Sequence, residues 1–169
     1  DGINLFIKEL NKVGVIFFVL PHLLKTYLDG AAFFSGKNPV IVYTGRYHRI
    51  DNFWFTVAHE IAHILKHLSD KILFVLDDLS KITVDKMENE ANAMASESLK
   101  HKESYQYLEP YFSYLTTDRI EECAMKYEIH PAVIVGNLAH EGKVSYRHQN
   151  LYNENVHQLI KKEYQEIYQ

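Results

Sequence analysis

The spacing of apolar residues along the chain predicts several helices and a few short strands. Apolar side chains recur every three or four residues in most segments, which is the period of one helical face. This pattern predicts helices over residues 3–12, 21–28, 52–68, 84–102, 118–127, 131–140 and 154–166. Runs rich in β-branched and aromatic residues predict strands over residues 15–20, 31–34 and 40–43. We therefore expect one compact α+β domain with a small antiparallel sheet; residues 69–83 and 104–115 show no clear period.

Turn and cap signals set the expected boundaries of these elements. The stretch SGKNP at residues 35–39 separates two strand-like runs, so residues 31–43 are expected to form a hairpin. Short polar residues in front of helical patterns are candidate N-caps, namely Asp51, Thr117 and Asn153. Pro131 fits the first turn of its helix, and Gly142 lies just past the end of that helix.

The segment FWFTVAHEIAHILKHL, residues 53–68, places titratable groups inside an apolar helical pattern. His59 and His63 are four residues apart, so they share one face of the helix. Glu60 lies about 100° round the helix from His59, beside a point that both imidazoles can reach. This is the H-E-x-x-H arrangement, in which two histidines bind zinc and the glutamate takes a proton from water.

Two structural histidines are the alternative interpretation of this helix. Buried imidazoles need hydrogen-bond partners, and a packed core can supply such partners without a metal. An apolar stripe on the other side of the helix favours rigidly held ligands: Ala58, Ile61, Ala62, Leu65 and Leu68. His67 repeats the four-residue spacing, but His59 and His67 are separated by about 12 Å along the helix axis. We therefore expect His67 at the surface or beside a ligand, not on the metal.

A third metal ligand is expected from the stretch MENEAN at residues 87–92. Glu88 and Asn92 share one helical face, so Glu88 can bind the metal while Asn92 hydrogen-bonds a ligand imidazole. Glu90 faces nearly the opposite side and is the alternative ligand, or else a solvated surface acid. Three protein ligands leave one position for water, which is typical of catalytic zinc, so we expect one zinc ion per chain.

Composition narrows the class of protein further. The net charge of -4 over 169 residues argues against direct nucleic-acid binding by this chain. The longest apolar run near the start, residues 13–20, is too short to span a membrane, so no membrane association is expected. Cys123 is the only cysteine, which makes a cytoplasmic location the default. Because the chain opens at Asp1 and not at Met, a targeting signal or an upstream domain can precede it.

Two motifs together resemble the ImmA/IrrE family of zinc metallopeptidases. FTVAHEIAHILKH is similar to the family pattern F-T-x-x-H-E-x-x-H, and ENEANAMA to the pattern E-x-E/Q-A-N/D-x-F-A. The similarity extends over RYHRIDNFWF at residues 46–55. The stretch IHPAVIVGNLAHEGKVSY at residues 129–146 resembles a subgroup linked to an N-terminal helix-turn-helix, antitoxin-like regulator. Met94 departs from the pattern, since the family usually has phenylalanine there, but the two side chains have similar volumes.

This resemblance implies a mainly helical, gluzincin-like domain with a zincin-type active-site helix. It implies that residues 1–146 form the metallopeptidase domain and residues 147–169 a helical extension of it, with an upstream DNA-binding domain absent from this chain. His59, His63 and Glu88 match the metal ligands of the family, and Glu60 matches its catalytic base. The implied substrate is a partner protein inside the cell, such as a transcriptional repressor cut at one site.

Hydrolysis of a peptide bond also needs a donor for the developing oxyanion. The candidates close to the active-site helix in the chain are Tyr43, Arg46, Tyr47 and His48. Farther along, His130 is expected to be a turn or cap residue, and His140 an exposed residue whose charge complements the end of its helix. The sequence does not rank these groups, although residues 46–51 are nearest to the H-E-x-x-H helix.

A non-enzymatic alternative is the regulatory part of a DNA-binding antitoxin or repressor. Its metal site would then serve stability, sensing or dimerisation. Glu60 argues against this alternative, because a structural zinc site usually has four protein ligands and no base beside it.

Overall fold

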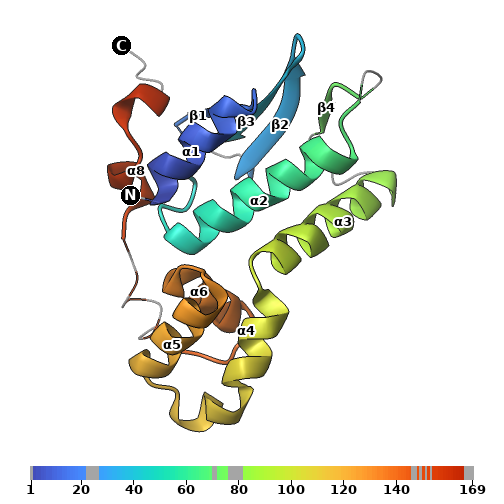
Figure 1. The fold of residues 1–169 in the computed structure, drawn as a ribbon. Coiled ribbons are helices and arrows are strands. Elements are labelled where there is room, and N and C mark those ends of the chain that lie inside the picture. Colours follow the sequence, from blue (N-terminus) through green and yellow to red (C-terminus); the bar gives the residue numbers. More distant parts are fainter. Residues whose placement is uncertain are drawn as a thin grey trace.

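The computed structural model describes residues 2–21, 27–69, 72–75, 82–145, 148, 150, 152 and 154–165. Helices dominate, with one small sheet near the N-terminus (Figure 1). In chain order the elements are α1 (Gly2–Lys12), β1 (Ile16–Val19), β2 (Gly30–Ser35), β3 (Asn38–Tyr43), α2 (Ile50–Lys66), β4 (Phe74–Val75), α3 (Ile82–Ser98), α4 (His101–Leu108), η1 (Glu109–Tyr114), α5 (Thr117–Tyr127), α6 (Pro131–His140), α8 (Val156–Leu159) and η2 (Lys162–Tyr164). The expected mainly helical α+β class is confirmed. Among the described helices, none is both long and apolar enough to cross a bilayer.

The sheet has the strand order β1-β3-β2-β4. Strands β2 and β3 form the expected antiparallel hairpin, with Gly30 opposite Tyr43 and Ser35 opposite Asn38. Strand β4 is antiparallel to β2, but β1 runs parallel to β3, so the expectation of a purely antiparallel sheet is wrong at that edge. The reason is topological: after β1 the chain crosses over before it enters the hairpin, and β1 then pairs with the free edge of β3.

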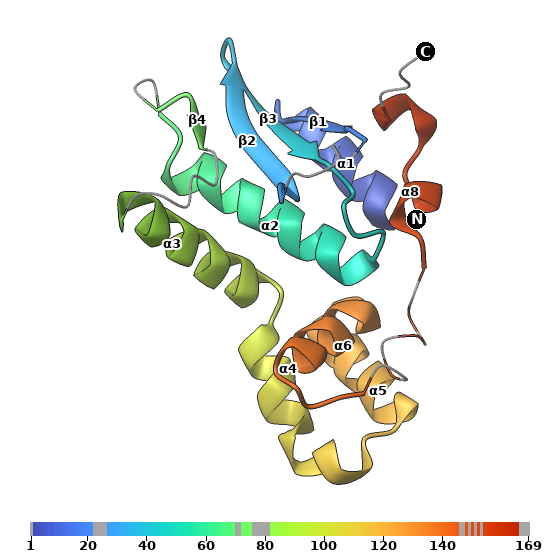
Figure 2. The ribbon, with the colours of Figure 1, turned by 180° about the vertical axis from the view of Figure 1, so that it is seen from behind.

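Helix α2 packs on β2 and β3 and carries much of the main core. Phe53 is fully buried and meets Tyr43 and Phe17 edge to face, with ring centroids 5.2 and 6.1 Å away. Ile7 of α1 and Val57 of α2 belong to the same cluster. Figures 1 and 2 show α2 lying along the sheet, with α3 beside it on the other side. The core therefore fixes one side of α2 and leaves another side facing α3.

Helices α4, α5 and α6 build a second apolar cluster below α2 and α3 (Figure 2). Its buried members are Leu108, Ile120, Cys123, Ala124, Ile134, Val135 and Leu138. Helix α6 packs against the first turn of α2, where a Cβ on Gly136 would lie 2.3 Å from Asp51 Oδ2. Glycine is required at this crossing, and the contact places the second cluster next to the N-terminal half of α2.

The expected cap at Asp51 is wrong. Helix α2 already begins at Ile50, and Arg49 occupies the N-cap position without a side-chain hydrogen bond. Asp51 instead lies in the first turn, where it accepts a hydrogen bond from Arg49 Nε at 2.9 Å. A carboxylate in the first turn complements the positive end of the helix dipole, so Asp51 stabilises the helix start through its charge and not as a cap.

The helix boundaries near α6 follow the sequence more closely. His130 is the N-cap of α6, and its Nδ1 accepts a hydrogen bond from Ala132 N at 3.1 Å, which confirms the cap interpretation. Pro131 is the first helical residue and Gly142 follows the helix at φ +68°. In α5 the cap is Thr116 and not the expected Thr117.

Three other predicted helices differ from the structure or lie outside its described part. The single helix expected over residues 154–166 is wrong. A short helix, α8, and a 3-10 turn, η2, stand in its place. The chain bends towards α1 between them, where Lys161 N donates to Asn4 Oδ1 at 2.9 Å. The helix expected over residues 84–102 ends at Ser98, since Lys100 takes a left-handed conformation with φ 56° before α4. Most of the helix expected over 21–28, and the cap Asn153, lie outside the described residues.

Candidate metal centre

The facing sides of α2 and α3 bring His59, His63 and Glu88 to one point. One ligand atom from each of these residues lies within 4.8 Å of the other two. His59 Nε2 and His63 Nε2 are 2.8 Å apart, and the Glu88 oxygens lie 3.0 Å from His59 Nε2 and 3.1 Å from His63 Nε2. Two imidazole nitrogens and one carboxylate are a donor set that suits zinc.

Asn92 lies one turn beyond Glu88 on α3 and contacts the other nitrogen of His59. The distance from Asn92 Oδ1 to His59 Nδ1 is 2.9 Å. An amide oxygen only accepts hydrogen bonds, so Nδ1 of His59 carries the hydrogen and a neutral ring keeps its lone pair on Nε2. This lone pair points at His63 and Glu88, and the arrangement expected for Asn92 is therefore present.

The shared point fits a cation. Glu88 Oε1 is buried and has no hydrogen-bond partner among the described residues, although it lies near His63 Nε2. His63 is only 2% exposed, so water does not easily solvate these atoms. Converging lone pairs and a buried carboxylate oxygen repel one another unless a positive charge lies between them. A divalent metal supplies that charge without requiring protonation of a ring.

The pKa shifts of His59 and Glu88 agree with a site that favours positive charge. Burial disfavours a charged His59 ring, but its hydrogen bond to Glu88 and the charges of Glu60 and Glu88 outweigh burial, so the pKa of His59 is raised. Burial also opposes ionisation of Glu88, yet the nearby rings of His59 and His63 outweigh burial and hold the pKa of Glu88 far below the ordinary value. Glu88 is therefore an anion at neutral pH, as a metal ligand must be.

Glu60 follows His59 on α2 and is 6% exposed. Its carboxylate lies against the start of β2, where a Cβ on Gly30 would be 2.7 Å from Glu60 Oε1 and 2.7 Å from Thr56 Cγ2. Only glycine allows the strand to approach this closely. The sequence does not single out Gly30, because nothing local to residues 29–31 reveals which helix packs on the strand.

Glu90 and His67 do not join the metal group. Among the described residues, the group that could hold an ion contains His59, His63 and Glu88 alone. Glu90 Oε2 instead lies 3.1 Å from His67 Nε2, and His67 Nδ1 lies 2.9 Å from His63 Nδ1. The structure therefore favours Glu88 over Glu90 as the ligand from α3, and it places His67 directly behind His63.

A cleft of about 730 Å³ lies between α2, α3, α4 and α6, and Asn92 is part of its lining. Residues from five segments line it, including Tyr47, Phe55, Asn92, His101, Asn137 and His140. Phe55 stacks on His101 with ring centroids 5.9 Å apart and lies 6.4 Å from the His59 ring. Burial and the nearby His140 lower the pKa of His101, which keeps its ring neutral near pH 7. Sequence reasoning missed His101, since its place beside Phe55 depends on how separate helices pack in space.

The residues expected to contact an oxyanion are dispersed. Tyr43 is fully buried and its hydroxyl donates to Tyr47 O at 2.8 Å; burial raises its pKa. Arg46 lies over the rings of Tyr27 and Tyr47, with its guanidinium carbon 5.0 and 4.9 Å from their centroids. His48 packs edge to face on His157 at 4.7 Å. Of the four, Tyr47 alone lines the cleft, so it remains the candidate for contacting the oxyanion.

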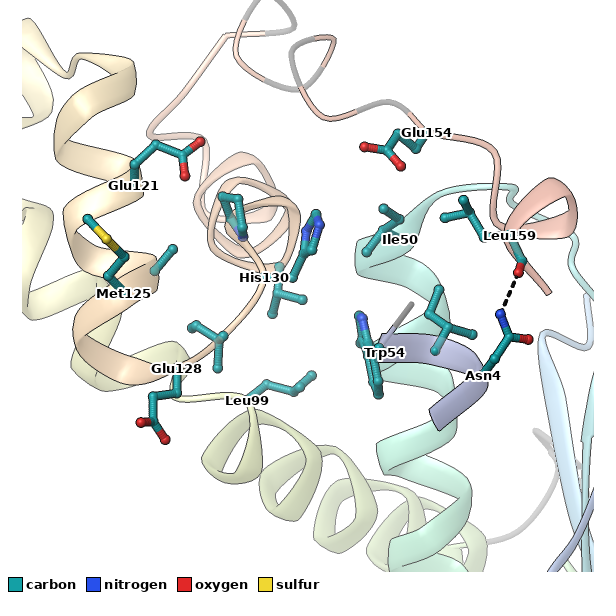
Figure 3. A pocket seen from close by; sticks show the side chains of 16 residues that line it. Asn4, Ile50, Trp54, Leu99, Glu121, Met125, Glu128, His130, Glu154 and Leu159 are labelled. Carbon is teal, nitrogen blue, oxygen red and sulfur yellow. Dashed lines mark hydrogen bonds between the residues drawn. The ribbon is translucent and has the colours of Figure 1, made fainter. Parts of the chain in front are cut away.

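A second cavity of about 720 Å³ lies elsewhere, between α1, α2, α5 and the C-terminal segment (Figure 3). Ile50 and Trp54 of α2 line it on one side, and Glu121, Met125 and Glu128 of the α5 region on the other. None of the three residues of the metal group lines either cavity. The two volumes are also similar, so volume does not separate them. Asn92, which contacts His59, lines the first cavity and not the second, so the first is the candidate cleft beside the metal group.

A family model matches most of the chain. The model of peptidase family M78, described as the IrrE N-terminal-like domain, matches residues 2–147. No match was found among curated proteins. The matched range contains every described element from α1 to α6, and with them the metal group and the cleft. The resemblance to ImmA/IrrE metallopeptidases is confirmed, and the chain belongs to the IrrE N-terminal-like family of M78 peptidases.

Proposed function

We propose that the protein is a zinc-dependent endopeptidase that cuts a specific partner protein. The observation that carries this proposal is the convergence of His59, His63 and Glu88 on one point, with Glu60 on the next position of the same helix. Membership of a peptidase family supports the reaction class. The donor set is one that zinc prefers, and three protein ligands are typical of catalytic sites.

The roles of the residues follow from their places in the site. His59, His63 and Glu88 would hold the ion, and bound zinc would supply an acidified water and a Lewis acid for the scissile carbonyl. Asn92 orients the His59 ring through Nδ1. The buried carboxylate of Glu60 accepts a proton from the attacking water and passes it to the leaving amine nitrogen as the C–N bond breaks.

The cleft beside Asn92 is the proposed place of the substrate chain. It is lined by aromatic rings, amides and two histidines, so it offers both apolar surface and hydrogen-bonding groups to a peptide. Tyr47 is our candidate for stabilising the oxyanion, because its phenol can donate a hydrogen bond. The family resemblance supports a regulatory protein, such as a transcriptional repressor in the cytoplasm, as the substrate.

A comparison of protein N-termini tests this proposal in a mixture of all candidate substrates at once. Zinc-loaded wild-type protein and Glu60→Gln protein are each incubated with an extract of the native host, and new N-termini are identified by mass spectrometry. We expect a small set of new N-termini with the wild type and none with Glu60→Gln. If both proteins bind zinc and yield identical N-termini, the non-enzymatic regulatory domain becomes the better account.

A further inference from the structure

His67 is the buried residue behind the metal group whose role the proposed mechanism does not use. It lies one turn beyond His63, at the C-cap of α2, and is 9% exposed. Both of its ring nitrogens are engaged: Nδ1 is 2.9 Å from His63 Nδ1, and Nε2 is 3.1 Å from Glu90 Oε2. These contacts form a continuous chain from α3 through His67 to the imidazole of His63.

The chemistry of the three groups fixes the direction of this chain. An ionised carboxylate only accepts hydrogen bonds, so His67 Nε2 donates to Glu90. A neutral imidazole has one N–H group, so Nδ1 of His67 must accept. The hydrogen between the two Nδ1 atoms therefore belongs to His63. Nε2 of His63 then carries a lone pair, and this is the atom that faces His59 and Glu88.

We propose that His67 and Glu90 act as a relay that holds His63 in its metal-binding tautomer and orientation. This inference rests on the zinc site proposed above. Neither residue supplies a ligand atom to the point shared by His59, His63 and Glu88, so both are positioning residues. Asn92 of α3 does the same for His59 with a single contact, whereas Nδ1 of His63 contacts His67, which in turn contacts Glu90 of α3.

Burial supports a specific role for the relay. The His67 side chain is 6% exposed, and an unpaired ring nitrogen at such a place is costly. The Glu90 side chain is 44% exposed and also lies 3.8 Å from Lys86 Nζ, so it stands at the rim of the site. The relay thus connects a solvated carboxylate to a buried ligand, an arrangement that orients the ligand and raises its basicity.

Zinc affinity of the full chain, measured by competition with a chromophoric chelator, tests the relay. His67→Phe keeps a ring of similar size but removes the acceptor, and we expect zinc binding to weaken by about 10- to 100-fold. His67→Asn places an amide oxygen near the Nδ1 position, and we expect affinity close to that of the wild type. Glu97→Gln, an exposed substitution on the same helix as Glu90, is the matched control and should change nothing.

Each outcome separates the relay from the zinc site itself. Equal affinity of wild type and His67→Phe would overturn the relay and leave the zinc site intact. Absence of zinc binding by the wild type would contradict the proposed function. Should His67→Phe not fold, ¹⁵N NMR of histidine-labelled wild type decides the matter. We expect hydrogen on Nδ1 of His63 and on Nε2 of His67; the opposite tautomer of His67, or a charged ring, would overturn the relay.

Discussion

The carboxylate of Glu60 and the backbone of Gly30 lie in direct contact, so that a Cβ at position 30 would stand 2.7 Å from Glu60 Oε1. The first residue of β2 thus forms part of the wall that holds the proposed general base. Strand β2 and helix α2 therefore meet beside the carboxylate that is proposed to transfer a proton.

Gly30→Ala is expected to impair the reaction while leaving metal binding intact. The added methyl group must push Glu60 and Thr56 aside, at a cost of about 1–3 kcal/mol in the free energy of unfolding. A displacement of the base by about 1 Å can lower the rate by about 100-fold. Cleavage rate and zinc content measure the two effects. Gly2→Ala is the control, since a Cβ there meets nothing within 4 Å; equal cleavage by both variants would contradict this account of Glu60.

The cap of α6 is expected to make stability depend on pH. Desolvation of the ring lowers the pKa of His130 below its ordinary value, and Nδ1 must stay unprotonated to accept the hydrogen bond from Ala132 N. The unfolded chain then binds the proton more readily than the folded one, so stability is full above about pH 6.5 and falls as the pH drops towards the lower folded pKa. Urea unfolding at pH 7.5 and pH 5.5 measures the change.

His130→Asn is the matched variant for this pH effect. Asparagine is a good N-cap at both pH values, whereas loss of a cap costs about 1 kcal/mol. We therefore expect a smaller fall in the free energy of unfolding between pH 7.5 and pH 5.5 in the variant than in the wild type. Equal falls in the two proteins would show that the acid sensitivity arises at other groups.

Cys123 is expected to be unreactive in the folded protein. It is fully buried in the second apolar cluster, and burial raises the pKa of its thiol to about 11. The thiolate is the reactive form, so it is scarce at pH 8. Treatment with iodoacetamide followed by mass spectrometry should show little alkylation in buffer and complete alkylation in denaturant. Rapid alkylation in buffer would contradict the described packing of α5.

The sequence predicts the metal group well because its spacing is local. His59 and His63 lie on one face of one helix, and the i, i+4 pair Glu88 and Asn92 lies on one face of the next, so both sets follow from helical geometry. The contact between Glu90 and His67 could not be predicted in the same way. Glu90 lies on another side of α3 from Glu88, and its carboxylate still reaches His67 at the end of α2.

Features that depend on contacts between distant segments could not be predicted. The parallel pairing of β1 with β3 follows from the order of strands in space. The last predicted helix is replaced by a bend because Asn4, at the other end of the chain, hydrogen-bonds Leu159 O and Lys161 N. The cleft likewise depends on the docking of α6 against α2 and of α4 against α6, which brings His101 to Phe55.

In the proposed site His59, His63 and Glu88 bind one zinc ion while Glu60 remains available for proton transfer. Elemental analysis of the purified wild type, Glu60→Gln and Glu88→Ala proteins measures this binding. We expect about one zinc per chain in the wild type and in Glu60→Gln, and a strong loss in Glu88→Ala. A wild type that carries no metal and takes up none from added zinc would contradict it, and the two histidines would then be structural residues of the core.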